Sequence, residues 1–325
     1  MEIVFTAILA AVIAFVGSFI LLKMNFSFLP KDGGKTAVTP DGKIVEVNSA
    51  SRGKTTGVGL LFTIVWYIVT IAVYGFSGGV NIPLLVNVGL LFAMTMAGYL
   101  DDRAKVHWRD LLKGEIDLVI AIAVTAAFLF FNGMDTEVCF FTWHMTLHPA
   151  VYVALAIVML WASVNVTNCS DGVDGLSGGV TIVECIAFFL IFPDLPKEYG
   201  GMALTLAGAL IAYLFFNWFP SSQLMGDGGS RPIGLFLGML AMQSKHPFAL
   251  LLMSFVFIFD GGVGLVKVFL KRRLKIVILE KIRYPFHDHL RKNLNWNVPN
   301  TSLLAIGAEV VCSAVCGVLL MLFGG

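Results

Sequence analysis

Long apolar runs recur along the whole length of this 325-residue chain, and they limit what it can fold into. Ten such segments lie near 3–22, 58–76, 82–100, 116–131, 149–167, 178–193, 202–219, 233–243, 247–270 and 302–323. An α-helix needs roughly 20 apolar residues to cross a bilayer, and in hydrocarbon only helices and closed barrels pair all their backbone groups. We therefore expect an all-α polytopic membrane protein of about ten transmembrane helices, forming one domain over residues 1–325.

The composition agrees with a membrane protein. Charged residues make up 13% of the chain, against roughly 25% in soluble domains. The net charge of +1 gives no reason to expect a nucleic-acid partner. The five cysteines form no CxxC pair or metal-ligand spacing, so most are expected to be small apolar fillers. The first apolar run lacks a basic leader and a small-residue cleavage site, which favours a retained span.

The distribution of basic residues predicts the orientation. With ten spans, 19 of the 22 Lys and Arg residues fall in loops on one side. Omitting the short segment 233–243 would move the strongly basic loop 271–301 to the other side. We therefore expect both termini on the outer face and the polar clusters, with an active-site cleft, on the cytoplasmic face.

The most polar interruption follows the fifth segment, at residues 168–175. Asn168, Asp171 and Asp174 recur every three residues, so they face one side of a short helix or cup, and Gly172 and Gly175 permit close approach of backbone or ligand. Carboxylates beside a membrane span are costly unless they bind something. The alternative is a helix-capping loop in which the side chains satisfy backbone donors.

Two further acidic clusters are predicted on the same face. Asp101 and Asp102 follow the third segment, and the repulsion between adjacent carboxylates is relieved by a divalent cation or a nearby base. Asp227, between two glycines, follows the seventh segment and suits a metal together with a phosphate. The competing interpretations are a solvated helix end and an ordinary Asp-Gly turn.

The first cytoplasmic loop has two recognisable parts. Residues 37–47 are predicted to form a small hairpin around a Pro-Asp-Gly turn at 40–42. The stretch Ser51–Gly59 combines glycines, hydroxyls and Lys54 at a helix N-terminus, which is a weak phosphate-binding pattern. A flexible, positively charged loop explains the same residues.

Ionisable residues also interrupt the apolar segments. Asp260, followed by two glycines, is a candidate functional residue or marks a helix break, and Glu184 raises the same question more weakly. The basic run 271–275 suits anionic lipid headgroups. Beyond it, His287 and His289 flank an aspartate, and such a pair can bind metal or phosphate or shuttle protons.

Four motifs occur in a fixed order: Asp-Asp at 101–102, Asn-x-x-Asp-Gly-x-Asp-Gly-Leu at 168–176, Met-Gly-Asp-x-Gly-Ser at 225–230 and Pro-Phe-His-x-His-Leu at 285–290. Together they resemble the polyprenyl-phosphate N-acetylhexosamine-1-phosphate transferases. The Pro-Phe-His element favours the muramoyl-pentapeptide branch of that family. The resemblance covers the chain from the second segment onward, and ten spans with outer termini match it.

The resemblance implies a Mg²⁺-dependent transferase of the bacterial cytoplasmic membrane. Its expected reaction moves phospho-MurNAc-pentapeptide from UDP-MurNAc-pentapeptide to undecaprenyl phosphate, giving lipid I and UMP for peptidoglycan synthesis. The resemblance also implies a homodimer surrounded by membrane lipids. A one-step attack and a covalent aspartyl intermediate both stay open.

The resemblance assigns roles to individual residues. Asp227 is expected to bind Mg²⁺, and Asp101 and Asp102 to lie at the reacting phosphates, with Asp101 taking the proton of the lipid phosphate. His287 is expected to act beside them. Substrate contacts are expected from Thr56, Asn168, Asp171, Asp174 near the uracil, Gly175, Asn217, Ser230 and His289.

The chain departs from the family pattern in four places. Aspartate separates His287 from His289 where the family has three consecutive histidines, and Lys54-Thr55-Thr56 replaces Thr-Pro-Thr. Leu224 stands where an aromatic side chain would stack on uracil. The basic residue expected after Asp102 has two candidates, Lys105 and Lys113.

Two other functions fit parts of the sequence. A sister transferase using UDP-GlcNAc or a related UDP-sugar would carry the same motifs. An ion-coupled transporter would also have inward polar clusters and broken helices, but a carrier places its key charges near the membrane midplane. Here the acidic clusters lie in loops on one face, which favours an enzyme.

Overall fold

The computed structural model describes residues 2–24, 26–33, 35–38, 44–48, 51–78, 82–104, 108–140 and 143–323. The long helices are α1 (Glu2–Lys23), α2 (Gly59–Gly78), α3 (Ile82–Arg103), α4 (Asp110–Phe131), α5 (Pro149–Ser170), α6 (Leu176–Ile191), α7 (Lys197–Asn217), α8 (Asp227–Gln243) and α13 (Val298–Phe323). The strands are β1 (Lys35–Val38), β2 (Ile44–Asn48), β3 (Glu137–Phe140) and β4 (Trp143–Thr146). Shorter helical pieces are α9 (Ala249–Met253), α10 (Phe255–Phe257), η1 (Ile258–Gly262), α11 (Val263–Phe269), η2 (Leu270–Leu274) and α12 (Phe286–Lys292).

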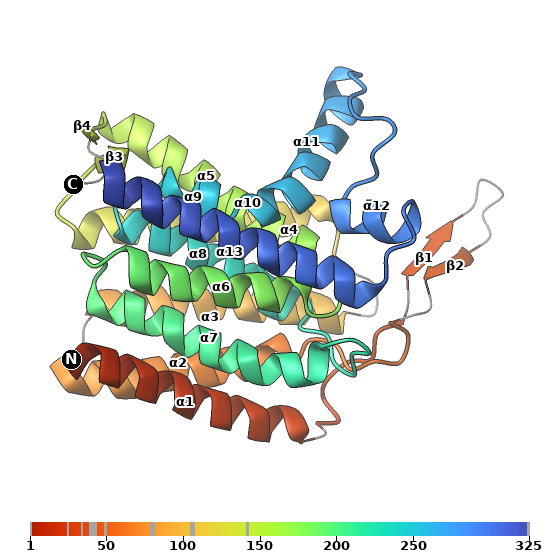
Figure 1. The fold of residues 1–325 in the computed structure, drawn as a ribbon, viewed down its shortest axis with the longest axis horizontal. Helices are drawn as coiled ribbons and strands as arrows, with labels where there is room; N and C mark the ends of the chain where they lie inside the picture. Colours follow the sequence, from red (N-terminus) through yellow and green to blue (C-terminus); the bar gives the residue numbers. More distant parts are fainter. Residues whose placement is uncertain are drawn as a thin grey trace.

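The long helices lie side by side along a common direction, as the apolar runs predict (Figure 1). The start of α1 and the end of α13 lie at one end of the bundle, and the β1–β2 hairpin projects from the other. Helix α8 is the centre, because its residues 228–242 are all buried among α2, α3, α5, α6 and α9. A short, glycine-rich helix fits there because small residues let neighbouring backbones approach closely.

Six helices in the described residues are long and apolar enough to cross a membrane: α1, α3, α4, α5, α7 and α13. Residues 59–75 of α2 and helix α6 are apolar but shorter. Large apolar side chains such as Phe5, Ile8 and Val311 are exposed on the bundle surface. Such a surface requires a lipid environment, because soluble proteins rarely expose contiguous apolar patches of this size.

The ninth apolar segment is not the continuous helix expected from its hydropathy. It is interrupted at Ser254, and residues Ile258–Gly262 around Asp260 form a π-helical turn. The predicted break at the glycine pair therefore takes the form of a π bulge, a feature frequent at functional sites. Beyond it, α11 projects away from the other helices (Figure 1).

Two antiparallel hairpins lie at opposite ends of the helical bundle. The β1–β2 pairing confirms the predicted hairpin, whereas its Pro-Asp-Gly turn lies outside the described residues. The β3–β4 pairing was not predicted, because four-residue strands carry too little periodicity to be read from sequence. The backbone N–H of Cys139 in β3 donates to the Lys245 carbonyl at 2.7 Å. All five cysteines are free, and three are buried, as expected of small fillers.

Candidate active site

The ends of four helices meet at the end of the bundle that carries the β1–β2 hairpin. Helices α3 and α5 end there, and α4 and α8 begin there. A methyl group at Gly98 of α3 would collide with the carbonyl of Asp227, so glycine is required for this close approach. Gly226, just before α8, adopts φ +68°, a conformation that other residues rarely adopt. These two glycines bring the first acidic cluster against the start of α8.

Asp102 caps the start of α8. Its two carboxylate oxygens accept the backbone N–H groups of Asp227 and Gly228, each at 3.0 Å. The first N–H groups of a helix have no partner within the helix, and an anion there also complements the helix dipole. Asp102 therefore fixes the position of Asp227. The Asp102 carboxylate itself is occupied by the backbone N–H groups of α8.

Lys113 joins the two acidic clusters. Its ammonium lies 2.5 Å from Asp101 Oδ2 and 3.0 Å from Asp227 Oδ2. Asn168 Nδ2 donates to the other Asp227 oxygen at 2.9 Å and to Ser230 Oγ at the same distance. Residues from α3, α4, α5 and α8 thus form one charged network, which we call the Asp227 cluster (Asp101, Lys113, Asn168, Asp227 and Ser230).

The donor set of the Asp227 cluster fits a divalent cation. Two carboxylates, from Asp101 and Asp227, converge on one positively charged group, the Lys113 ammonium. Mg²⁺ prefers one or two carboxylates and completes its octahedron with water and substrate phosphates. The described residues hold no cluster of three or more His, Cys, Asp or Glu side chains able to bind a metal by themselves. Such a site therefore suits a metal that arrives with a phosphate ligand.

A buried ion pair fixes the backbone at Lys113. The guanidinium of Arg231 in α8 bonds to Asp117 in α4 through Nε at 3.1 Å and through Nη2. Nη2 also donates to the carbonyl of Lys113 at 3.3 Å. Both side chains are about 2% exposed. The pair holds the start of α4 against α8, one turn beyond Asp227.

The acidic loop after α5 is held in place by several polar contacts. Asp174 Oδ2 accepts the Ser221 N–H at 3.0 Å and lies 3.4 Å from Lys54 Nζ. The Lys54 ammonium also donates to Ser221 Oγ at 2.7 Å. Asn217, which is buried, accepts the Gly175 N–H at 2.8 Å. The 168–175 stretch and the loop before α8 are thereby locked to each other.

His287 is held by Asp260 of the π turn. The Asp260 carboxylate accepts the backbone N–H of His287 at 2.7 Å and lies 2.8 Å from its Nδ1. Both residues are about 5% exposed. A methyl group on Gly172 would lie 2.6 Å from His287 Nε2, so that nitrogen faces the acidic loop. A carboxylate at Nδ1 selects the tautomer with hydrogen on Nδ1 and leaves Nε2 for a ligand.

The structure separates the second histidine from the first. His289 Nδ1 accepts the Arg283 N–H at 3.3 Å, and its ring stacks on Phe286. The intervening Asp288 pairs with Lys292 at 2.6 Å. Only His287 of this motif is directed at the 168–175 loop by the contacts seen here. The assignment of His289 to substrate stays a prediction.

The remaining predicted site residues are placed by other contacts. Asp171 is the C-cap of α5, three residues after Asn168. Thr56 precedes Gly57. A methyl group added at Gly57 would contact the side chains of Tyr99 and Asp102. Asp174 and Asn217 lie on the other side of the acidic loop. Of the two lysine candidates, Lys113 belongs to the cluster, and Lys105 lies outside the described residues.

The sequence did not predict two pairings, that of Arg231 with Asp117 and that of Asp260 with His287. Lys113 was one of two candidates for the basic residue after Asp102. One signal was present, because Asp117 is a charged residue inside an apolar segment, four positions after Lys113. Neither the pairing of α4 with α8 nor that of α12 with the π turn follows from sequence spacing, because both depend on tertiary packing.

Carboxylates, an amide and a lysine that converge at one end of a bundle of apolar helices suit a membrane phosphosugar transferase. Residues 84–245 match the model of glycosyl transferase family 4. A phospho-N-acetylmuramoyl-pentapeptide-transferase of Treponema pallidum subsp. pallidum is 34% identical over 320 residues, covering 91% of this chain and 85% of the relative. The chain belongs to the phospho-N-acetylmuramoyl-pentapeptide-transferase family.

More distant relatives carry the same name. The protein of Campylobacter lari is 27% identical over 312 residues, covering 86% of each chain. That of Leptospira biflexa is 25% identical over 327 residues, covering 87% of this chain and 84% of the relative. These similarities extend over nearly all helices of the bundle. Together with the family model and the relative of Treponema pallidum, they indicate a phosphosugar transferase.

Proposed function

We propose that this protein transfers phospho-MurNAc-pentapeptide from UDP-MurNAc-pentapeptide to undecaprenyl phosphate, producing lipid I and UMP. A lipid phosphate oxygen attacks the phosphorus next to the sugar, the bond from that phosphorus to UMP breaks, and a new pyrophosphate forms. The observation that carries the proposal is the convergence of Asp101, Lys113 and Asp227 from three helices. Phosphoryl transfer needs such positioning and charge neutralisation more than covalent chemistry.

Within this reaction the cluster residues have distinct roles. Asp227 would hold Mg²⁺, which would neutralise charge on the reacting phosphates. Lys113 binds the phosphate oxygens, and Asn168 orients the Asp227 carboxylate. Asp101 takes the proton of the lipid phosphate when that phosphate arrives protonated. Asp174 and Lys54 bind the uridine end, and His287 presents Nε2 to the sugar phosphate.

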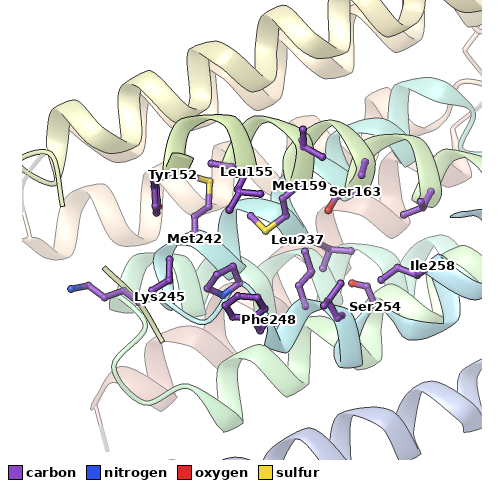
Figure 2. A pocket seen from close by; sticks show the side chains of 18 of the residues that line it. Tyr152, Leu155, Met159, Ser163, Leu237, Met242, Lys245, Phe248, Ser254 and Ile258 are labelled. Carbon is purple, nitrogen blue, oxygen red and sulfur yellow. The ribbon is translucent and has the colours of Figure 1, made fainter. Parts of the chain in front are cut away.

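An apolar cavity of about 380 Å³ suits the lipid acceptor. It lies between α5 and the α8–α9 region, with Met159 and Leu237 in its middle and Lys245 at one end (Figure 2). Thr167, which precedes Asn168 of the Asp227 cluster, is among the residues that line the cavity. Part of a polyprenyl chain would lie here with its phosphate directed toward the cluster.

Ten membrane crossings are the topology we propose. Helices α2, α6 and α8 and the interrupted α9–η2 segment would cross together with the six long helices. The basic loops would then face the cytoplasm of a bacterial cell and the termini the outside, so UDP-MurNAc-pentapeptide reaches the cluster from the cytoplasm. A homodimer stays a prediction from the family resemblance.

Product analysis tests this proposal. Purified protein in detergent is incubated with undecaprenyl phosphate, Mg²⁺ and either UDP-MurNAc-pentapeptide or UDP-GlcNAc, and the lipid products are identified by mass spectrometry. We expect lipid I from the muropeptide and no product from UDP-GlcNAc. A lipid-linked GlcNAc product would assign the chain to the sister activity instead. The absence of any lipid product from an active-site-intact, folded sample would refute the proposal.

A further inference from the structure

Two glutamates lie buried inside the bundle, away from the Asp227 cluster. Glu184 of α6 and Glu309 of α13 are both fully buried. Neither makes an ion pair with a basic side chain among the described residues. Both oxygens of Glu184 and Oε2 of Glu309 lack a hydrogen-bond partner there. Ionised carboxylates left this way inside a membrane protein are strongly unfavourable.

The packing of α6 against α13 places the two carboxyl groups at the same level. Gly179 of α6 contacts Ile306 of α13, and further along Ile191 contacts Gly317. The two helices therefore run parallel and in register, as they lie in Figure 1. Glu184 is five residues after Gly179, and Glu309 is three residues after Ile306. Each glutamate lies within the electrostatic reach of the other.

A third polar group points to a ligand at this position. Ser254, where the α9–α10 segment is interrupted, is 5% exposed and its hydroxyl has no hydrogen-bond partner. That hydroxyl faces Glu184. The other Glu309 oxygen, Oε1, accepts the Ser313 hydroxyl at 3.2 Å. Helix α6, helix α13 and the residue between α9 and α10 thus contribute four buried oxygens without a hydrogen-bond partner: both of Glu184, Oε2 of Glu309 and Oγ of Ser254.

We propose that Glu184 and Glu309 form an intramembrane proton-binding site that holds at least one proton at neutral pH and links α6 to α13. Two adjacent carboxyl groups in a low-dielectric site cannot both ionise, and a shared proton supplies the missing hydrogen bond. A proton needs no coordination sphere, so the two carboxyl groups can share it without further ligands. Ser254 also lines the apolar cavity (Figure 2), so its hydroxyl is the group through which a proton enters.

The glutamate pair is connected to the active site through the first residues of α6 and α13. Helix α6 begins at Leu176, two residues after Asp174, and Ser302 Oγ of α13 donates to the Asp174 carbonyl at 2.8 Å. Charge on both glutamates would force α6 and α13 apart. The other titratable groups near the pair are Cys185, Cys312 and Cys316. No described basic group is in position to compensate the second charge.

Infrared spectroscopy tests the proposal directly. The C=O stretch of a protonated carboxylic acid is recorded for the native protein at neutral pH and compared with Glu184→Gln and Glu309→Gln. We expect a band in the native protein that at least one of the two substitutions removes. Glu115→Gln, at an exposed position of α4, is the matched control and should leave the band unchanged. An unchanged spectrum in both variants would show ionised carboxylates and overturn the proposal.

Thermal unfolding gives a second, independent readout. The folded state keeps a proton that an exposed glutamate releases above about pH 4.3, so the native midpoint should fall as pH rises from about 6 to 9. Glu184→Gln keeps a hydrogen-bond donor without a titratable group, and we expect its midpoint to depend less on pH than the native one. A midpoint that rises with Na⁺ or a divalent cation in the native protein and in Asp227→Asn, but not in Glu184→Gln, would identify a metal-ion site at the glutamate pair and contradict the proton.

Discussion

Asp260 and His287, 27 residues apart in sequence, are joined by two contacts from one carboxylate, at 2.7 Å to the His287 backbone N–H and 2.8 Å to Nδ1. The π turn in the ninth apolar segment turns Asp260 toward α12, and the histidine places its other nitrogen against the 168–175 loop. Asp260, an aspartate within an apolar segment, is therefore the partner that orients His287. Carboxylates behind ligand-binding histidines serve this function in many sites.

Replacing Asp260 with Asn should lower kcat about 10- to 100-fold, the usual effect of removing such a partner. The amide no longer selects the tautomer with hydrogen on Nδ1, whereas the KM for the UDP-sugar changes little. Asp260→Glu should recover part of the activity. Asp288→Asn is the matched control, because that carboxylate pairs with Lys292 on the exposed side of α12. Full kcat in the Asp260→Asn variant would contradict the assigned role.

Replacing Lys113 with Met should reduce UMP release by about 10²- to 10³-fold, the range seen when a preorganised electrostatic group is removed. The ammonium is the positive group between Asp101 and Asp227, and Met preserves much of its length without its charge. The apparent affinity for Mg²⁺ should increase, because the cluster becomes more negative. Initial rates measured across Mg²⁺ concentrations, with Lys292→Met as control, check both effects. Activity within twofold of the native protein would exclude Lys113 from the phosphate site.

Replacing Arg231 with Met should destabilise the protein by about 3–5 kcal/mol, because it leaves the Asp117 carboxylate buried and unpaired. The double change Arg231→Met with Asp117→Leu should recover most of that loss, since well-packed apolar residues replace buried ion pairs at little cost. Denaturation midpoints of the native protein, the single variants and the double variant measure this coupling. Equal stabilities of the single and double variants would show that the ion pair is not the cause.

A larger side chain in the cavity between α5 and α8 should weaken binding of the lipid substrate and leave binding of the UDP-sugar unchanged. Leu237→Trp places a bulky ring in the middle of this space, and we expect the KM for undecaprenyl phosphate to rise about tenfold with little change in the KM for the UDP-sugar. Varying each substrate in turn separates the two constants. Leu240→Met, a nearly volume-conserving change in the same helix, controls for general repacking. An equal rise in both constants would place the lipid elsewhere.

Much of the site was predictable because helices that cross a membrane in succession alternate in direction. Loops after odd-numbered spans share a face, so the motifs at Asp101, Asn168, Asp227 and His287 were expected together. In the structure Asn168 donates to Asp227, and Lys113 joins Asp101 to Asp227. Hydropathy also anticipated the long helices of the bundle.

The unpredicted features are pairings decided by packing. The contacts of Arg231 with Asp117 and of Asp260 with His287 join segments more than 25 residues apart, and nothing in local spacing specifies such partners. The β3–β4 hairpin was missed because its strands are four residues long. The interruption of the ninth segment at Ser254 was missed because an apolar run gives no sign of where its helix breaks.

Asp227 gives the most direct test of the central claim that phosphoryl transfer occurs at the cluster. UMP release from UDP-MurNAc-pentapeptide is measured with undecaprenyl phosphate and Mg²⁺ for the native protein, Asp227→Asn and the exposed control Asp194→Asn, after equal folding is verified by thermal unfolding. We predict lipid-dependent release that is abolished by chelation, reduced at least 10²-fold in Asp227→Asn and unchanged in Asp194→Asn. Native-level release by a folded Asp227→Asn protein would contradict the account.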